Sequence, residues 1–291
     1  MNRIAGIFLI IVSAASFGTL AIIGRFAYAD GMDVTTLLFL RFTIAAILMF
    51  AWMALRREPL PRGRALLQLA GMGGLGYVGQ SFCYMSAIQY ASTGLVALLL
   101  YLYPVFVTVL TVIVQKKKIT SRTILALVLA TGGAALTANP EGGQLPGILL
   151  AVSAALIYAV YIIVGTDVMK QVSSVQSSAV IFSSAAVVFG LMTLIRGAHW
   201  PATQTGWLAV SGIALVATML PVATFLAGLK IVGATDASLL STLEPVVTVI
   251  LAAVVLSEPI LPSMLIGGAL ILAAVVITVQ RQKKPGGNAA T

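Results

Sequence analysis

Ten apolar runs, each close to the length of a membrane-spanning helix, constrain this chain more than any other feature of its sequence. They cover about residues 5–28, 34–54, 65–87, 91–114, 120–138, 146–166, 175–196, 207–229, 233–257 and 262–280. A helix of roughly 20 apolar residues spans the hydrocarbon of a bilayer. Charged residues make up only 9% of the chain, whereas a soluble domain carries about 25%. The sequence therefore predicts an all-α polytopic membrane protein with ten transmembrane helices.

The basic residues indicate how the chain lies in its membrane. If the N-terminus is cytoplasmic, all but three of the 17 Lys and Arg residues fall on the inner side, the exceptions being Arg25, Arg41 and Arg196. Cytoplasmic loops of membrane proteins carry such an excess of basic residues, so we expect both termini in the cytoplasm. The basic residues behind the net charge of +9 thus serve to orient the chain in the membrane. The loop at Lys116–Lys118 and the basic C-terminal tail are expected to contact lipid headgroups and not nucleic acid.

An internal repeat relates the two halves of the chain. Sliding the sequence by 141 residues aligns, without a gap, Gly6 with Gly147, Gly24 with Gly165, Gly71 with Gly212, Tyr84 with Phe225 and Pro104 with Pro245. The glycines could also serve close helix packing, but their shared offset favours duplication. Residues 1–141 and 142–291 thus form two units of five helices. Because five is odd, the second unit enters the membrane inverted, and inverted repeats can rock about a central cavity.

Glu244 places a carboxyl group in the middle of the ninth apolar run. A carboxylate at that depth is expensive, so it normally faces a polar cavity and marks a transport pathway. Pro245 follows directly and removes a backbone donor, so we expect the helix to be kinked or open there. The alternative is a neutral, hydrogen-bonded carboxyl group that serves packing only.

Polar and aromatic side chains at helical spacing accompany this acid. Ser241, Glu244 and Thr248 share one helix face, as do Tyr77, Gln80 and Tyr84 on the third run. The predicted substrate-binding residues are Tyr77, Gln80, Tyr84, Tyr101, Tyr103, Tyr158, Ser241 and Glu244, with Pro104 and Pro245 as hinges. A phenol ring suits an amphipathic or cationic solute. The alternative for the tyrosines is an aromatic belt at the membrane interface, and for Tyr161 the two interpretations are about even.

The other charged residues inside or beside the runs are assigned mainly structural roles. Arg41 could meet a substrate carboxylate, but we favour pairing with Asp30 or Asp33, or snorkelling to the interface. Arg25 is interpreted in the same way. Asp236 is expected to serve the N-terminal end of the ninth helix, where the helix dipole favours an acid.

Signatures of enzymes and metal proteins are absent from the sequence. It has no GxxxxGK[ST] motif for ATP and no HExxH or Cys/His cluster for a metal. Its only histidine, His199, falls in an outer loop, and its only cysteine, Cys83, is expected to serve packing. The sequence therefore predicts no enzyme, no cofactor and no metal site.

The segment STLEPVVTVILAAVVLSE, followed by LIGGALILAAVVIT, resembles the EamA-type branch of the drug/metabolite transporter superfamily. The first repeat departs from the family pattern with Gln115-Lys116-Lys117, where such proteins often have a glycine and an acid. That departure weakens any charge role for the motif's final acid, including Glu258. The resemblance implies efflux of small metabolites across a bacterial inner membrane through a central cavity, with the fifth and tenth helices peripheral. The tyrosine-rich interior is similar to that of amino-acid exporters within the family.

Together these features predict a secondary transporter, expected to be a monomer in lipid, that exports amino acids by alternating access. Apolar or aromatic amino acids are favoured, with related small metabolites as further substrates. One alternative is export of lipophilic cations or nucleotide-linked metabolites. Another is a non-transporting membrane scaffold or receptor, which would have a dry interior.

Overall fold

A computed structural model describes residues 3–114, 120–137, 145–166, 168, 171–233, 237 and 240–281 of the chain. The loop at Lys116–Lys118, the side chain of Asp236 and the basic C-terminal tail, for which predictions were made above, lie outside these residues. Within the described ranges the secondary structure is helical, and no strand occurs there.

Each predicted apolar run corresponds to one helical rod, and several rods are interrupted. The first half contains α1 (Arg3–Gly18) with α2 (Leu20–Ala29), α3 (Val34–Leu55), α4 (Gly63–Gly71) with η1 (Met72–Tyr77) and α5 (Val78–Tyr90), α6 (Thr93–Leu100) with α7 (Tyr103–Val114), and α8 (Ser121–Thr137). The second half contains α9 (Leu145–Gly165), α10 (Ser174–Arg196), α11 (Gln204–Ala214) with η2 (Leu215–Met219) and α12 (Leu220–Val232), α14 (Leu243–Leu256) and α15 (Pro262–Arg281).

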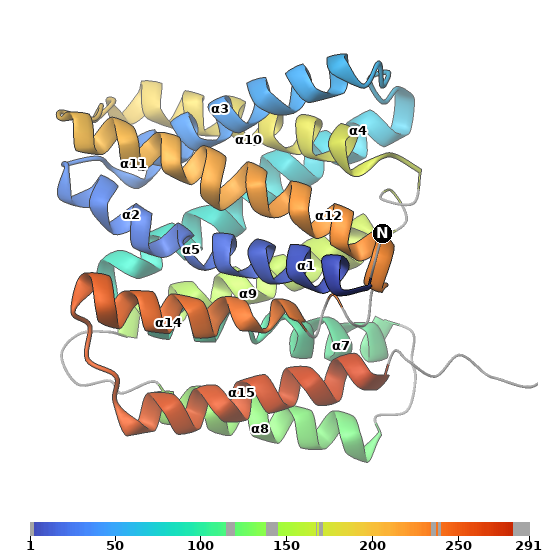
Figure 1. Cartoon of the computed structure of the whole chain (residues 1–291), viewed down its shortest axis with the longest axis vertical. Coiled ribbons are helices and arrows are strands. Elements are labelled where there is room, and N and C mark those ends of the chain that lie inside the picture. Colours follow the sequence, from blue (N-terminus) through green and yellow to red (C-terminus); the bar gives the residue numbers. More distant parts are fainter. Residues whose placement is uncertain are drawn as a thin grey trace, which may run out of the picture.

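Length and composition of these rods agree with a multi-pass membrane protein. Six of the described rods are long and apolar enough to cross a membrane, and three shorter apolar helices cover Ser121–Leu136, Leu243–Leu256 and Pro262–Ile277. In Figure 1 the rods lie side by side, roughly parallel or antiparallel. The predicted all-helical, polytopic fold is confirmed.

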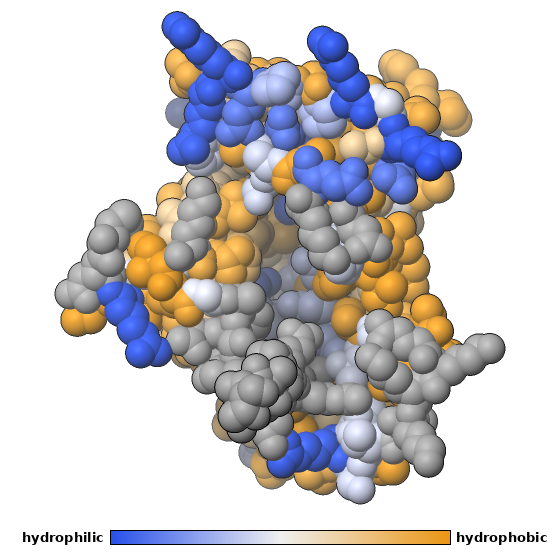
Figure 2. Space-filling view, turned by 90° about the vertical axis from the view of Figure 1, so that its right-hand side faces the viewer, coloured by the Kyte–Doolittle hydropathy of each residue, from blue (hydrophilic) through white to orange (hydrophobic). Residues whose placement is uncertain are grey.

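The bundle has two chemically different ends. We call the end that carries Arg56, Arg57, Arg62 and Arg64 the basic end, which lies to the right in Figure 1. The opposite end carries Asp30, Asp33 and Glu258, and we call it the acidic end. Figure 2 looks onto the basic end and shows hydrophilic side chains along one side of it and a hollow near its centre.

Glycine contacts recur at equivalent positions of the two halves. A β-carbon on Gly6, near the start of α1, would lie 2.8 Å from a methyl group of Val232 at the end of α12. One on Gly147, near the start of α9, would lie 2.6 Å from the β-carbon of Ala91. Both contacts obey the 141-residue offset, because Gly147 is equivalent to Gly6 and Val232 is equivalent to Ala91. Ala91 lies at the acidic end, where its carbonyl accepts a hydrogen bond from Arg25 in α2, so α9 begins at the end where the α1–α2 rod finishes.

Symmetric interruptions of the helices surround the middle of the bundle. The helix breaks at Tyr101 between α6 and α7, and again at Thr242 before α14, which is the equivalent position 141 residues later. Pro104 and Pro245 follow these breaks. The opening predicted at Pro245 is confirmed, and the equivalent helix is also interrupted before Pro104. Two π-helical segments, η1 and η2, also lie at equivalent places in the third and eighth rods. Such segments are rare and frequently occur at functional sites.

Helices α8 and α15 pair at one edge of the bundle, away from its centre (Figure 1). A β-carbon on Gly133 in α8 would lie within van der Waals radii of the backbone of Gly267 in α15, so small residues allow the two backbones to approach closely. The peripheral place that the family resemblance implied for the fifth and tenth helices agrees with this arrangement.

Candidate transport cavity

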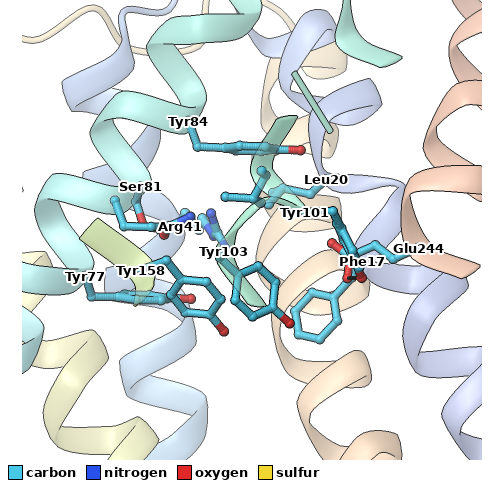
Figure 3. Close-up of a pocket in the computed structure, with 12 residues that line it drawn as sticks. Phe17, Leu20, Arg41, Tyr77, Ser81, Tyr84, Tyr101, Tyr103, Tyr158 and Glu244 are labelled. Atoms are coloured by element: carbon cyan, nitrogen blue, oxygen red, sulfur yellow. Dashed lines mark hydrogen bonds between the residues drawn. The ribbon is translucent and has the colours of Figure 1, made fainter. Parts of the chain in front are cut away.

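A cavity between the two halves contacts all eight predicted substrate-binding residues. Its first lobe has a volume of about 130 Å³. The predicted residues that line this lobe are Tyr77, Gln80, Tyr84, Tyr101, Tyr103, Tyr158 and Glu244 (Figure 3). A second lobe of about 250 Å³ shares four of them and adds Ser241. The structure therefore brings the predicted set together, with Ser241 on one side of it.

The second lobe extends the cavity toward the basic end. Ala14 lines this lobe, whereas Leu20 lines only the first. Because α1 starts at the basic end, Ala14 lies nearer to that end than Leu20 does. Figure 2 shows this end of the molecule hollowed near its centre.

Glu244 lies at the junction of the two lobes, in the first turn of α14. The hydroxyl group of Tyr101 lies 2.9 Å from its Oε2 atom and 2.6 Å from the carbonyl oxygen of Ser241. A phenol has one proton to donate, so the carboxylate and the carbonyl compete for it. The other carboxylate oxygen of Glu244 has no hydrogen-bond partner among the described residues. The acid thus retains capacity to accept a hydrogen bond from a solute.

Aromatic rings form a continuous wall along the cavity. From Glu244 toward the opposite side, the rings in contact are Tyr101, Tyr103, Tyr158, Tyr161, Tyr77 and Phe42. The centroids of Tyr103 and Tyr158 are 4.8 Å apart in an edge-to-face arrangement. Edge-to-face and offset pairs are favourable and hold rings in fixed orientations. Tyr161 contacts the rings of Tyr158 and Tyr77 but lines neither lobe, and it faces a separate groove beside η1.

Arg41 also lines the first lobe, and the pairing expected for it is wrong. Asp30 and Asp33 accept their hydrogen bonds from other groups, and no described acid forms an ion pair with Arg41. The residue is only 4% exposed, so it does not snorkel to the interface. Its Nε atom donates to the hydroxyl group of Thr218 at 3.0 Å, and its guanidinium group lies 4.9 Å from the ring centroid of Phe42.

The second lobe is also lined by residues that were not predicted: Ala14, Val222, Phe225 and Leu226. Four further residues of the first lobe were not predicted: Phe17, Leu20, Ser81 and Leu100. The sequence did contain a signal for three of them, because the 141-residue offset maps each of the three onto a tyrosine or serine already considered for the cavity. Phe17 corresponds to Tyr158, Leu20 to Tyr161, and Leu100 to Ser241. Two of these pairs, Phe17 with Tyr158 and Leu100 with Ser241, thus line the cavity from both repeats.

At the acidic end a cluster of residues joins the two halves, and we call it the clasp: Arg25, Ala91, Thr93, Gly94 and Glu258. The carboxylate of Glu258 accepts hydrogen bonds from the backbone N–H groups of Thr93 (3.0 Å) and Gly94 (3.3 Å) at the start of α6. Arg25 lies 3.8 Å from the same carboxylate and donates to Thr93 Oγ1 and the Ala91 carbonyl. Arg25 therefore has a structural role, as expected, but its acidic partner is Glu258 and not Asp30 or Asp33, and Glu258 has a charged partner despite the departure of the first repeat from the family motif.

Two further acids order the loops of the acidic end. Asp30 accepts hydrogen bonds from the side-chain hydroxyl and backbone N–H of Thr203. The hydroxyl donor holds the pKa of Asp30 below its usual value. Asp33 caps α3 through the backbone N–H of Thr35 at 3.0 Å. His199 lies 3.7 Å from Asp33, is largely exposed and is remote from the cavity.

Two helical repeats that enclose a polar cavity in a bundle of apolar rods indicate a membrane transporter. The EamA-like transporter family matches residues 4–139 and 145–280, two copies separated by the same 141 positions. The chain therefore belongs to the EamA-like transporter family, within the drug/metabolite transporter superfamily.

Known proteins similar to this chain agree with that assignment. An uncharacterized transporter of Archaeoglobus fulgidus is 30% identical over 273 residues, which cover 92% of this chain and 94% of the relative. The uncharacterized transporter YcbK of Bacillus subtilis is 24% identical and covers 87% of this chain and 86% of its own length. One solved crystal structure, 20% identical, superposes with a TM-score of 0.68 over 97% of this chain and all of its own. At that identity the likeness shows the fold alone.

Proposed function

We propose that this transporter exports amino acids, with a preference for apolar or aromatic side chains, by alternating access through the cavity between its halves. The observation that supports this most is the position of Glu244 in a tyrosine-lined cavity, with one carboxylate oxygen available. A carboxylate within a membrane bundle is a natural partner for a substrate ammonium group. The aromatic wall offers apolar surface to a side chain and negative ring faces to a cation.

In this proposal the two halves rock about the cavity, and the helix breaks before Pro104 and Pro245 act as hinges. The cavity extends toward the basic end, and the clasp closes the acidic end. We assign the basic end to the cytoplasm of a bacterial inner membrane, with both termini there and the protein acting as a monomer in lipid.

The test is efflux from proteoliposomes loaded with a labelled amino-acid mixture, with and without a pH gradient. Selective loss of apolar and aromatic amino acids would support the proposal, and dependence on the gradient would identify proton coupling. No loss beyond that of protein-free liposomes, with folded protein verified by size-exclusion chromatography, would overturn it.

Export of lipophilic cations is the second candidate, and it is favoured by the fact that Glu244 is the single acid among the described residues that line either lobe. Efflux of tetraphenylphosphonium that is lost in Glu244→Gln, together with no amino-acid efflux, would support it. Arg41 in the same cavity argues against it, because a buried cation repels a cationic substrate.

A further inference from the structure

We infer that Arg41 is the carboxylate-binding group of the transport cavity, so that the substrate is a zwitterion held between Arg41 and Glu244. This inference rests on the proposed function and deepens it by naming the charge pattern of the substrate. It assigns to Arg41 a role in recognition that its sequence context alone did not favour.

The hydrogen bonds of Arg41 leave most of its donors available. A guanidinium group has five N–H donors, and Arg41 uses its Nε donor for Thr218. Among the described residues, no acceptor bonds to its two Nη groups. No nitrogen atom of Arg41 is both fully buried and without a hydrogen-bond partner. The two Nη groups are therefore accessible, and we infer that they are accessible from the lobe that Arg41 lines. Figure 3 shows Arg41 on one side of the lining side chains and Glu244 on the other.

A fixed support orients this guanidinium group. The Thr218 hydroxyl accepts from Arg41 Nε and donates to the carbonyl of Ile213, five positions earlier, at 2.9 Å. Thr218 belongs to the π-helical segment η2, which ends the α11 hydrogen-bonding pattern at this point. Thr218 is 1% exposed and Arg41 is 4% exposed, so the pair is enclosed by protein on the sides away from the lobe. A substrate would therefore meet a preoriented pair of N–H groups.

The charges of the lining indicate which anion fits. Among the described residues that line the two lobes, Arg41 is the single basic residue and Glu244 the single acid, so their charges cancel when both are ionised. A buried charge without a partner is strongly unfavourable. A zwitterion supplies one counter-charge to each residue. A phosphate monoester carries about −1.5 to −2 charges at neutral pH and would exceed what one arginine offsets. A carboxylate matches the two parallel N–H groups of a guanidinium fork.

The first experiment measures binding of three related probes to the purified protein in detergent. L-Phenylalanine carries both charges, 2-phenylethylamine lacks the carboxylate, and 3-phenylpropanoate lacks the ammonium group. Wild-type protein is expected to bind phenylalanine about 10- to 100-fold more tightly than either, since hydrogen bonds to charged groups have that strength. Arg41→Gln should remove the preference over phenylethylamine, and Glu244→Gln the preference over phenylpropanoate. Arg25→Gln, in the clasp outside the cavity, is the matched control and should keep both preferences.

A preference for phenylalanine over phenylethylamine that survives in folded Arg41→Gln would overturn the inference. Arg41→Lys and Thr218→Val keep the charge but lose the fork or its support. Each variant is expected to reduce the preference for phenylalanine over phenylethylamine only partly. Complete loss of this preference in both variants, or an unchanged preference in both, would contradict the bidentate geometry.

A second experiment tests Arg41 without any amino acid, so the inference and the proposed function can fail separately. A cysteine replaces Ser81, which lines the lobe with Arg41, in a Cys83→Ser background. We compare labelling by an anionic and a cationic methanethiosulfonate of similar size. Arg41→Gln should lower the anionic-to-cationic rate ratio at least about fivefold, because a charge within a few ångströms acts strongly in a low-dielectric cavity. An unchanged ratio would remove Arg41 from the cavity surface, whatever the substrate is.

Discussion

The clasp at the acidic end gives the sharpest prediction about how the cavity opens. In the alternating-access scheme the contacts of Glu258 with Thr93, Gly94 and Arg25 must break when the acidic end opens. Weakening them should therefore shift the population toward the open form. We predict this shift for Glu258→Gln, which keeps the size of the side chain and removes its charge.

The contacts of Glu258 set the expected magnitude. The amide of the variant retains one acceptor oxygen, so one of the two backbone N–H groups at 3.0 and 3.3 Å keeps a partner. A hydrogen bond to a charged group contributes about 1.5–3 kcal/mol, and a neutral one about 0.5–1.5 kcal/mol. The ion pair with Arg25, at 3.8 Å and partly exposed, adds about 0–1 kcal/mol. A net loss of about 1–2 kcal/mol corresponds to about a 5- to 30-fold change in the equilibrium.

The assay uses a cysteine at Ile88 in the Cys83→Ser background. Ile88 is 0% exposed and lies in the last turn of α5, which ends directly before Ala91 of the clasp. An impermeant thiol reagent should therefore reach a cysteine there only when the acidic end opens. Glu258→Gln should raise the labelling rate by the factor above. Glu58→Gln is the matched control, because Glu58 accepts a hydrogen bond from Ser173 at the basic end. This control should leave the labelling rate unchanged. An unchanged rate in folded Glu258→Gln would refute the reasoning and leave the clasp as a helix cap only.

Three further predictions concern the site, the packing and the loops. Glu244→Gln should weaken binding of an amino acid about 10- to 100-fold with little change in melting temperature; wild-type affinity would exclude an ammonium contact. Gly6→Val should destabilise the protein by about 1–3 kcal/mol, seen as a lower melting temperature, whereas Gly71→Ala should not, because nothing lies within 4 Å of a β-carbon there; equal effects would contradict the packing argument. Since the Thr203 hydroxyl lowers the pKa of Asp30, the stabilisation it gives is complete above the usual pKa of 3.8 and is lost as pH falls below it. Tryptophan fluorescence should therefore show a transition at acid pH that Asp30→Asn lacks, and a transition that persists in the variant would be inconsistent with this.

Features that depend on local sequence were predicted well. Apolar length determined the rods, and the missing N–H donor of Pro245 predicted where one of them opens. The 141-residue offset reproduced the glycine contacts because both repeats pack their helices in the same way. Glu244 was predicted to face a cavity because a carboxyl group inside an apolar run is costly unless polar surroundings receive it.

Features that depend on which helices meet could not be predicted. The hydroxyl group that orients Arg41 lies 177 positions away, and the backbone groups that hold Glu258 lie 165 and 164 positions away. An arginine with acids nearby in sequence therefore gave the wrong partner. The departure of the first repeat from the family motif likewise said nothing about Glu258, because its contacts cross between the halves.

Blocking the cavity between the two halves tests most directly whether amino acids cross the membrane through it. Phe17 lines both lobes, so a cysteine at this position, in the Cys83→Ser background, can carry a bulky maleimide into the path. We predict that this variant exports labelled amino acids from proteoliposomes before alkylation, loses export after it, and is alkylated more slowly when phenylalanine is present. Export that continues after complete alkylation would contradict transport through this cavity.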